Sequence, residues 1–145
     1  MPFRIELLHH WTPERVAEAL PSIIECAKRI VAEHPDEMTL GSLYQGVASG
    51  DTLLWLVTDD DEPNIAILTV YTTLRHYTAT GITFVEITGI AGDHIHEALP
   101  LLDEIEDWAA ANHAQKIIVK GRDGWTKLLR DRGYSKTSAV LAKAI

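Results

Sequence analysis

The sequence has only one cysteine, Cys26, so it cannot close an intramolecular disulfide or supply a cysteine-based zinc site. It also lacks any run near the roughly 18 consecutive apolar residues that a membrane-spanning helix needs. The first residues, Met1–Glu6, show no basic segment followed by an apolar core, as a secretory signal would. Together these absences predict that the protein is located in a reducing compartment. We expect a cytoplasmic protein with no membrane partner.

Positive charge is also scarce. The 145 residues carry 13 basic and 21 acidic side chains, a net charge of −8 with neutral histidines. Nucleic acid binding depends on lysines and arginines that neutralise phosphates, so this balance disfavours a nucleic acid partner. The length suits one domain, and the hydrophobic (46%) and charged (23%) fractions are those of a soluble globular protein. We therefore expect a single domain over residues 1–145.

The first third of the sequence shows helical periodicity. Thr12 and Pro13 look like an N-cap and a first helical residue, and apolar residues then recur at spacings of three and four. Because Pro21 interrupts this pattern, it predicts two helical pieces, about 13–19 and 22–33, with a kink or break between them. A further helix is expected from Thr39 to Gly50, with glycine ending it.

The middle and the end of the sequence alternate between strand and helix signals. Apolar and β-branched runs predict strands at 53–58, 64–74, 82–88, 116–120 and 135–144, a loop at 89–93, and helices at 97–112 and 125–131. A strand–helix–strand order implies a parallel pair with a crossover. The predicted fold is α/β (α+β), with a single mixed, mostly antiparallel sheet and helices on both faces.

This order of elements, together with five short segments, resembles the GNAT superfamily of N-acetyltransferases, and more specifically the short GNAT-like proteins encoded by bacteriophages and prophages. The segments that carry the resemblance are Gly50–Trp55, Gly89–Gly92, Leu101–Ala109, Ile117–Trp125 and the pair Gly133-Tyr134. It covers about residues 13–144. The resemblance implies a GNAT-like fold and an acyl-CoA-dependent N-acetyltransferase.

The resemblance also implies a cofactor site, because GNAT enzymes hold acetyl-CoA beside their fourth strand. The pyrophosphate of the cofactor sits on backbone N–H groups at the start of the following helix, where unpaired donors and a positive dipole end favour anions. Here that segment is Gly89–His96. The cofactor-binding residues implied are Ile87, Thr88, Gly89, Ala91, Gly92, His94 and Arg122.

The sequence departs from the GNAT pattern at this loop. The stretch from Thr88 to His94 lacks the leading cation and the closing Gly/Ala pair of the superfamily, and Asp93 adds a carboxylate where phosphates would lie. The tyrosine that often protonates the leaving thiolate corresponds to Leu129, which cannot donate a proton, whereas Tyr134 lies nearby in the sequence. The cofactor loop is therefore interpreted as degenerate.

Glu86 is the acidic residue of the predicted strand 82–88. A glutamate there could act as general base toward a substrate ammonium, although simple alternation of a solvent-facing residue also explains it and is favoured. With Tyr134 it forms the predicted catalytic pair.

Other groups of polar residues suggest binding sites but are also explained by ordinary structural roles. Asp93, His94, His96 and Glu97 suggest a metal patch, but no third ligand is identifiable at useful spacing, so we expect no metal. The acidic residues of 103–107 indicate either a solvated helix face or a surface for a basic partner. Residues 121–124 suggest either an anion-binding turn or a helix cap at Asp123.

Two functions therefore stay open. The first is an N-acetyltransferase that uses acetyl-CoA on a small-molecule or protein amine, with Glu86 as base and the acid unassigned. The second is a catalytically inactive GNAT-fold scaffold, acting as a phage structural (virion) protein or in contact with a host protein. A binder of another acyl or anionic molecule in the same cleft is a weaker third hypothesis. An exposed edge strand would also allow a homo-oligomer.

Overall fold

The computed structural model describes residues 2–120, 124–137 and 141–145. Within them one five-stranded sheet runs in the order β1-β2-β3-β4-β5, with antiparallel neighbours up to β4 and a parallel β4–β5 pair. The strands are β1 (Phe3–Leu7), β2 (Leu53–Asp59), β3 (Leu68–His76), β4 (Thr83–Gly92) and β5 (Lys116–Val119). The helices are η1 (Leu8–His10), α1 (Pro13–Glu33), α2 (Leu40–Ser49), α3 (Ile95–Ala98), η2 (Leu99–Leu101), α4 (Leu102–Ala111) and α5 (Gly124–Arg130).

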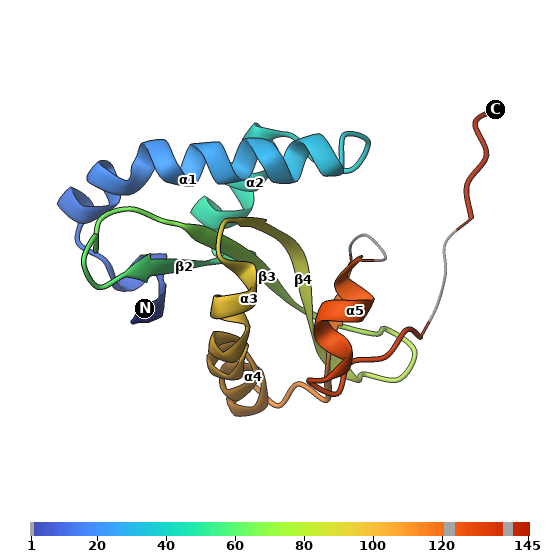
Figure 1. Ribbon diagram of the computed structural model, residues 1–145. Helices are drawn as coiled ribbons and strands as arrows, with labels where there is room; N and C mark the ends of the chain where they lie inside the picture. Colours follow the sequence, from blue (N-terminus) through green and yellow to red (C-terminus); the bar gives the residue numbers. More distant parts are fainter. Residues whose placement is uncertain (1, 121–123, 138–140) are drawn as a thin grey trace.

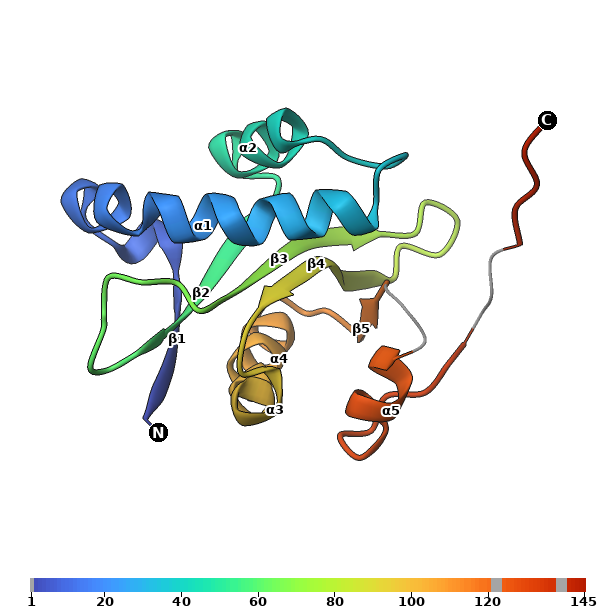
Figure 2. The ribbon, with the colours of Figure 1, turned by 45° about the horizontal axis from the view of Figure 1, so that its top comes forward.

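Helices cover both faces of the sheet, as predicted (Figures 1 and 2). On one face α1 and α2 close an apolar core that includes Ile30, Leu43, Leu56 and Tyr71. On the other face α3, α4 and α5 close a second core around Trp55, Ile87, Leu102, Ile105 and Leu129. The fold is α/β with a single mixed, mostly antiparallel sheet, and its two cores lie on opposite faces of that sheet.

The prediction of a break at Pro21 is wrong, because α1 is one helix from Pro13 to Glu33. Pro21 lies on the exposed side, so its missing N–H leaves a carbonyl group that water can reach. The opposite side buries Ala19, Ile23, Cys26, Ala27 and Ile30 against the sheet. Packing thus holds the helix together through the proline. The predicted caps Thr12 and Gly50 are confirmed, and Gly50 is left-handed with φ of 84°. Thr39 is the N-cap of α2.

Three other boundaries differ from expectation. The strand β1 was not predicted, although Phe3–Leu7 alternates in polarity and pairs with β2 from Phe3↔Asp59 to Leu7↔Trp55. The strand predicted from residue 64 begins at Leu68. The helix expected over 97–112 is divided into α3, η2 and α4, because Pro100 cannot donate a backbone hydrogen bond within a continuing helix.

The predicted strand at 135–144 is not formed in the residues that the structure describes there. Residues 135–137 and 141–145 form no strand, and 138–140 lie outside the described residues. Figure 1 shows the end of the chain directed away from the sheet. Within the described chain, β5 is therefore the last strand at this side of the sheet.

The predicted loop at 89–93 is wrong as well, since β4 continues as a strand to Gly92. The register with β3 shifts between Tyr71 and Thr72, so that Tyr71 faces Gly89 and Thr72 faces Ile87. Thr88 is the extra residue of this bulge, and its hydroxyl donates to the carbonyl oxygen of Tyr71 at 3.3 Å. A bulge adds twist and redirects a strand, which here happens where β4 leaves β5.

Candidate functional site

The candidate site lies where β4 and β5 part. Their parallel pairing runs only from Phe84↔Lys116 to Ile87↔Val119. The amide of Lys120 reaches the carbonyl oxygen of Ile87 at 3.5 Å and ends the contact. Beyond this point, the stretch from Gly89 to Gly92 pairs with β3 alone in the described part of the chain. This leaves one backbone edge of β4 available to hydrogen-bond another molecule.

A cleft of about 430 Å³ adjoins this edge. Its lining residues come from α1 (Arg29 and Glu33), from the sheet (Leu68, Ile90, Ala91 and Gly92), from α3 (Ile95) and from α5 (Gly124, Trp125 and Leu128). The walls are thus mainly apolar, with charged side chains at the α1 side. This volume lies in the range of small-molecule and cofactor sites.

Only some of the predicted cofactor residues line this cleft. Ala91 and Gly92 do, whereas Ile87 is buried in the core under α4, and Thr88 occupies the bulge. Arg122 lies outside the described residues.

His94 adopts a left-handed conformation (φ 60°) at the start of α3 without capping it through its side chain. Its ring lies 5.5 Å from that of Phe3, and its Nδ1 lies 3.9 Å from Glu97 Oε2. Among the described residues, no group of three or more histidine, cysteine or acidic side chains could hold a metal ion.

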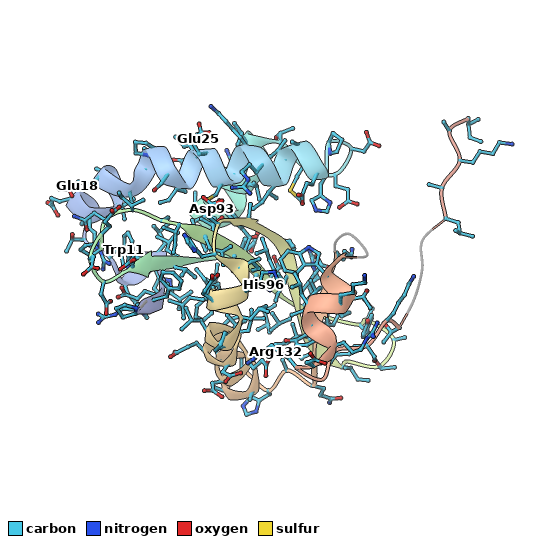
Figure 3. The ribbon with its side chains drawn as sticks, viewed as in Figure 1. Trp11, Glu18, Glu25, Asp93, His96 and Arg132 are labelled. Carbon is cyan, nitrogen blue, oxygen red and sulfur yellow. The ribbon has the colours of Figure 1, made fainter. Side chains whose placement is uncertain are left out.

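Arg29, on α1, places a cation beside the segment Gly92-Asp93. Its Nη1 lies 3.5 Å from Asp93 Oδ1, and its Nη2 donates to the carbonyl oxygen of Gly92 at 3.2 Å. Asp93 lies between α1 and α3 in Figure 3, and its side chain is 77% exposed. Sequence reasoning missed Arg29 because it is 64 residues from Asp93, and only the packing of α1 on β4 brings the two together.

Gly89 and Gly92 allow the backbone to approach its neighbours closely. A Cβ at Gly89 would lie 2.7 Å from Cγ2 of Ile30, so the glycine lets α1 pack directly on β4. Gly92 has a φ of 143°, and a Cβ there would lie 2.2 Å from the carbonyl oxygen of Ile67. A larger residue at Gly92 would therefore disturb the sheet itself, and cannot serve as a selective test of ligand binding.

Glu86 is not a solvent-facing residue, contrary to the simpler expectation. It is 8% exposed on the α1 side of the sheet. Its Oε2 lies 3.4 Å from Nε of Arg75, and its Oε1 lies 3.3 Å from Nζ of Lys120. Alternation therefore does not explain this residue, because a buried carboxylate needs partners and here has two cations. It lies three residues before Gly89, roughly 10 Å along a strand.

Tyr134 is bound to α4. Its hydroxyl donates to Glu106 Oε2 at 3.0 Å, and its ring packs against the core of that face. Burial and the neighbouring Glu106 carboxylate raise the pKa of the Tyr134 phenol. Glu86 faces the α1 side, so the structure does not bring the predicted catalytic pair together. Leu129, at the position of the missing tyrosine, is a buried core residue.

The acidic face of α4 has partners within the chain. Arg132 pairs with Asp103, and Tyr134 donates to Glu106, so two of its carboxylates hold the segment that follows α5. Arg132 is labelled beside α4 in Figure 3. This explains part of the charge cluster without an external basic partner.

Three of the tryptophans and the single cysteine have structural roles. Trp55 is buried and makes an edge contact with Trp108, which packs against the same core. Trp11 is also buried, with the guanidinium carbon of Arg15 3.6 Å from the ring centroid. The thiol of Cys26 is buried, and this burial raises its pKa, which disfavours the reactive thiolate.

No protein-family model and no curated protein sequence match the chain. Solved structures match over its full length. A GNAT family acetyltransferase from Staphylococcus aureus has a TM-score of 0.67 at 11% identity, covering 100% of both chains. Glucosamine-6-phosphate N-acetyltransferase from Arabidopsis thaliana has a TM-score of 0.69 at 12% identity, covering 99% of each. AAC(6')-Iy, in complex with a bisubstrate analog of CoA, has a TM-score of 0.70 at 14% identity, covering 100% of this chain and 99% of that one.

The chain therefore has the fold of the GNAT acetyltransferases, as the resemblance implied. The phage origin receives no support from these matches. Within the described residues, no helix is both long and apolar enough to cross a membrane.

Proposed function

We propose that the chain binds acetyl-CoA in the cleft between β4, α3 and α5 and transfers its acetyl group to an amine. The observation that carries this proposal is the parting of β4 from β5 beside a cleft of about 430 Å³. It supplies both a backbone edge and a cleft beside that edge. The likeness to AAC(6')-Iy bound to a CoA analog supports the assignment.

The residues at the cleft fit the chemistry of such a cofactor. The backbone of Thr88–Gly92 offers donors and acceptors for an extended chain that contains amides. Ile90, Trp125 and Leu128 offer apolar walls for its methylene groups. Arg29 offers a guanidinium for its phosphates, with Asp93 opposing part of that charge. Bound there, the cofactor would supply an activated thioester acyl group.

The chain would contribute mainly position and proton transfer. The strand edge would orient the thioester carbonyl, and an amine held above β4 would form the new C–N bond as the C–S bond breaks. Glu86 is the proposed acceptor of the proton that leaves the nitrogen. Tyr134 stays a predicted catalytic residue, and its hydroxyl is engaged by Glu106 in the structure.

The inactive scaffold has its own supporting observations. The Glu86 carboxylate is neutralised by Arg75 and Lys120, Asp93 places a negative charge at the cleft, and Leu129 fills the position of the usual acid. Under this second proposal, the chain keeps the fold and contacts another protein, of phage or host.

Calorimetric titration with acetyl-CoA separates the two proposals. Arg29→Gln should weaken binding roughly tenfold, because one charge-assisted phosphate contact is lost. Lys28→Gln is the matched control, since Lys28 is the adjacent residue on α1 and pairs with Glu25 instead. It should change the affinity less than twofold. A folded protein that binds no acetyl-CoA at millimolar concentration would overturn the first proposal and favour the scaffold.

A further inference from the structure

A second polar cluster lies on the α1 side of the sheet, outside the cleft. Register pairs place Thr73 with Glu86 and Arg75 with Phe84 across β3 and β4, and Phe84 with Lys116 across β4 and β5. Since register partners share a face, these side chains and that of Lys120 lie on the same side. The β3–β4 turn extends past the C-terminal end of α1 in Figure 2.

The cluster is built around the Glu86 carboxylate. That side chain is 10% exposed, whereas those of Arg75 and Lys120 are 50% and 61% exposed. One buried anion thus anchors two cations whose outer atoms face solvent, and the three residues together carry a charge of +1. In a chain of net charge −8, this is a local reversal of sign.

Arg75 and Lys120 have further hydrogen-bond donors that are not used in their contacts with Glu86. Arg75 uses Nε toward Glu86, and within the described residues its two terminal amino groups have no partner. Lys120 uses one of three donors in the same way. A guanidinium fork beside an ammonium is the arrangement that recognises a carboxylate or a phosphate group.

Aromatic residues flank the cluster on one side. The rings of Tyr77 and Phe84 stack at 4.5 Å, and Lys116 Nζ lies 4.9 Å from the centroid of Tyr77. On the opposite side, along β4, the strand reaches the bulge at Thr88 where the proposed thioester site begins. A molecule held at Arg75 and Lys120 would therefore lie between an aromatic wall and the proposed acetyl donor.

We propose that Arg75 and Lys120 bind the carboxylate or phosphate group of the acceptor, so that the acceptor is an amine that also carries an anionic group. Glu86 holds the two cations in place and lies beside the amine end of the same molecule. The assignment of this molecule as the acceptor rests on the proposed function. The anion site itself does not, because it is defined by residues outside the cleft.

NMR titration of the full chain at fixed ionic strength tests the anion site without acetyl-CoA. The probes are two matched pairs, phosphoethanolamine with ethanolamine and β-alanine with propylamine. Saturable shifts in β5 and in the Arg75 side chain are expected for phosphoethanolamine, for β-alanine or for both. The probe that binds more tightly shows whether the site prefers a phosphate or a carboxylate group. Ethanolamine and propylamine that bind as tightly as their anionic partners would overturn the proposal.

Substitutions of single residues test whether the anion binds at Arg75 and Lys120. Arg75→Gln and Lys120→Gln should each weaken the binding of the anionic probe roughly tenfold, because each removes one charge-assisted contact. In each variant the other cation still pairs with Glu86, which protects the fold. Lys127→Gln on α5 removes the same charge elsewhere and should leave binding unchanged. Equal effects of all three substitutions would contradict a specific site and indicate general charge attraction.

Separate measurements distinguish this proposal from the proposed function. If acetyl-CoA binds, the anionic amine should be acetylated with a kcat/KM at least tenfold above that of its matched amine, and Arg75→Gln should remove that difference. If acetyl-CoA does not bind but the anionic probe does, the acetyl-transfer proposal fails and the anion site stands.

Discussion

At the scale of single residues, Gly92 shows how closely β4 and β3 approach at the edge of the cleft. Gly92→Ala should lower the free energy of unfolding by at least about 2 kcal/mol, because its Cβ would meet the backbone of Ile67 at a φ of 143°. Gly41→Ala on α2 is the control, since its Cβ would meet only ordinary contacts at 3.6 Å. Chemical denaturation measures both. A Gly92→Ala protein as stable as the wild type would contradict the observed approach of the two strands.

Ionisation of the Tyr134 and Tyr71 phenols makes the free energy of unfolding depend on pH in the alkaline range. Burial raises the pKa of Tyr71 to about 12, and burial with the Glu106 charge raises that of Tyr134. Both folded-state pKa values exceed the unfolded value of about 10. Their contribution is therefore complete below pH 10 and is lost as the pH rises through the folded-state pKa values. We expect the free energy of unfolding to fall above pH 10.

Tyr134→Phe tests the part played by this residue. The variant should lose about 1 kcal/mol at neutral pH with the hydrogen bond to Glu106, and should lose less stability than the wild type above pH 10. Glu106→Gln should also reduce the alkaline loss, since it removes the neighbouring charge. An alkaline loss in Tyr134→Phe equal to that of the wild type would show that this phenol does not contribute.

At the scale of elements, α1 is continuous through Pro21. Pro21→Ala restores a backbone donor within the helix and should raise the free energy of unfolding by about 1–2 kcal/mol. Pro35→Ala is the control, because Pro35 follows the end of α1 and interrupts no helix. Thermal denaturation of the three proteins compares them. Destabilisation by Pro21→Ala would indicate that the proline is needed to shape the helix.

The elements that local signals define were predictable from the sequence. Thr39 and Gly50 mark both ends of α2 because capping depends on residues at fixed positions. Helix continuity at Pro21 was not predictable, since packing against the sheet decides it. The strand character of residues 89–92 depends on pairing with β3, and two glycines in four residues locally favour a loop.

At the scale of the whole molecule, the candidate site joins segments that are far apart in the sequence. The resemblance pointed to the end of β4, and Ala91 and Gly92 of that strand line the cleft. Arg29 and Trp125 come from α1 and α5, and only the three-dimensional packing places them there. The partners of Glu86 likewise lie on β3 and just beyond β5. Long-range pairing of this kind has no local sequence signal.

The most direct test of the central claim is to map acetyl-CoA binding on the protein by amide chemical shifts. We predict saturable shifts that are largest from Thr88 to Gly92 and at the start of α5, with the side chain of Trp125 among them. Arg29→Gln should weaken this response and Lys28→Gln should not. A folded protein that shows no saturable response, or shifts confined to α2 and the β1 edge, would contradict the assignment of the cleft as the acetyl-CoA site.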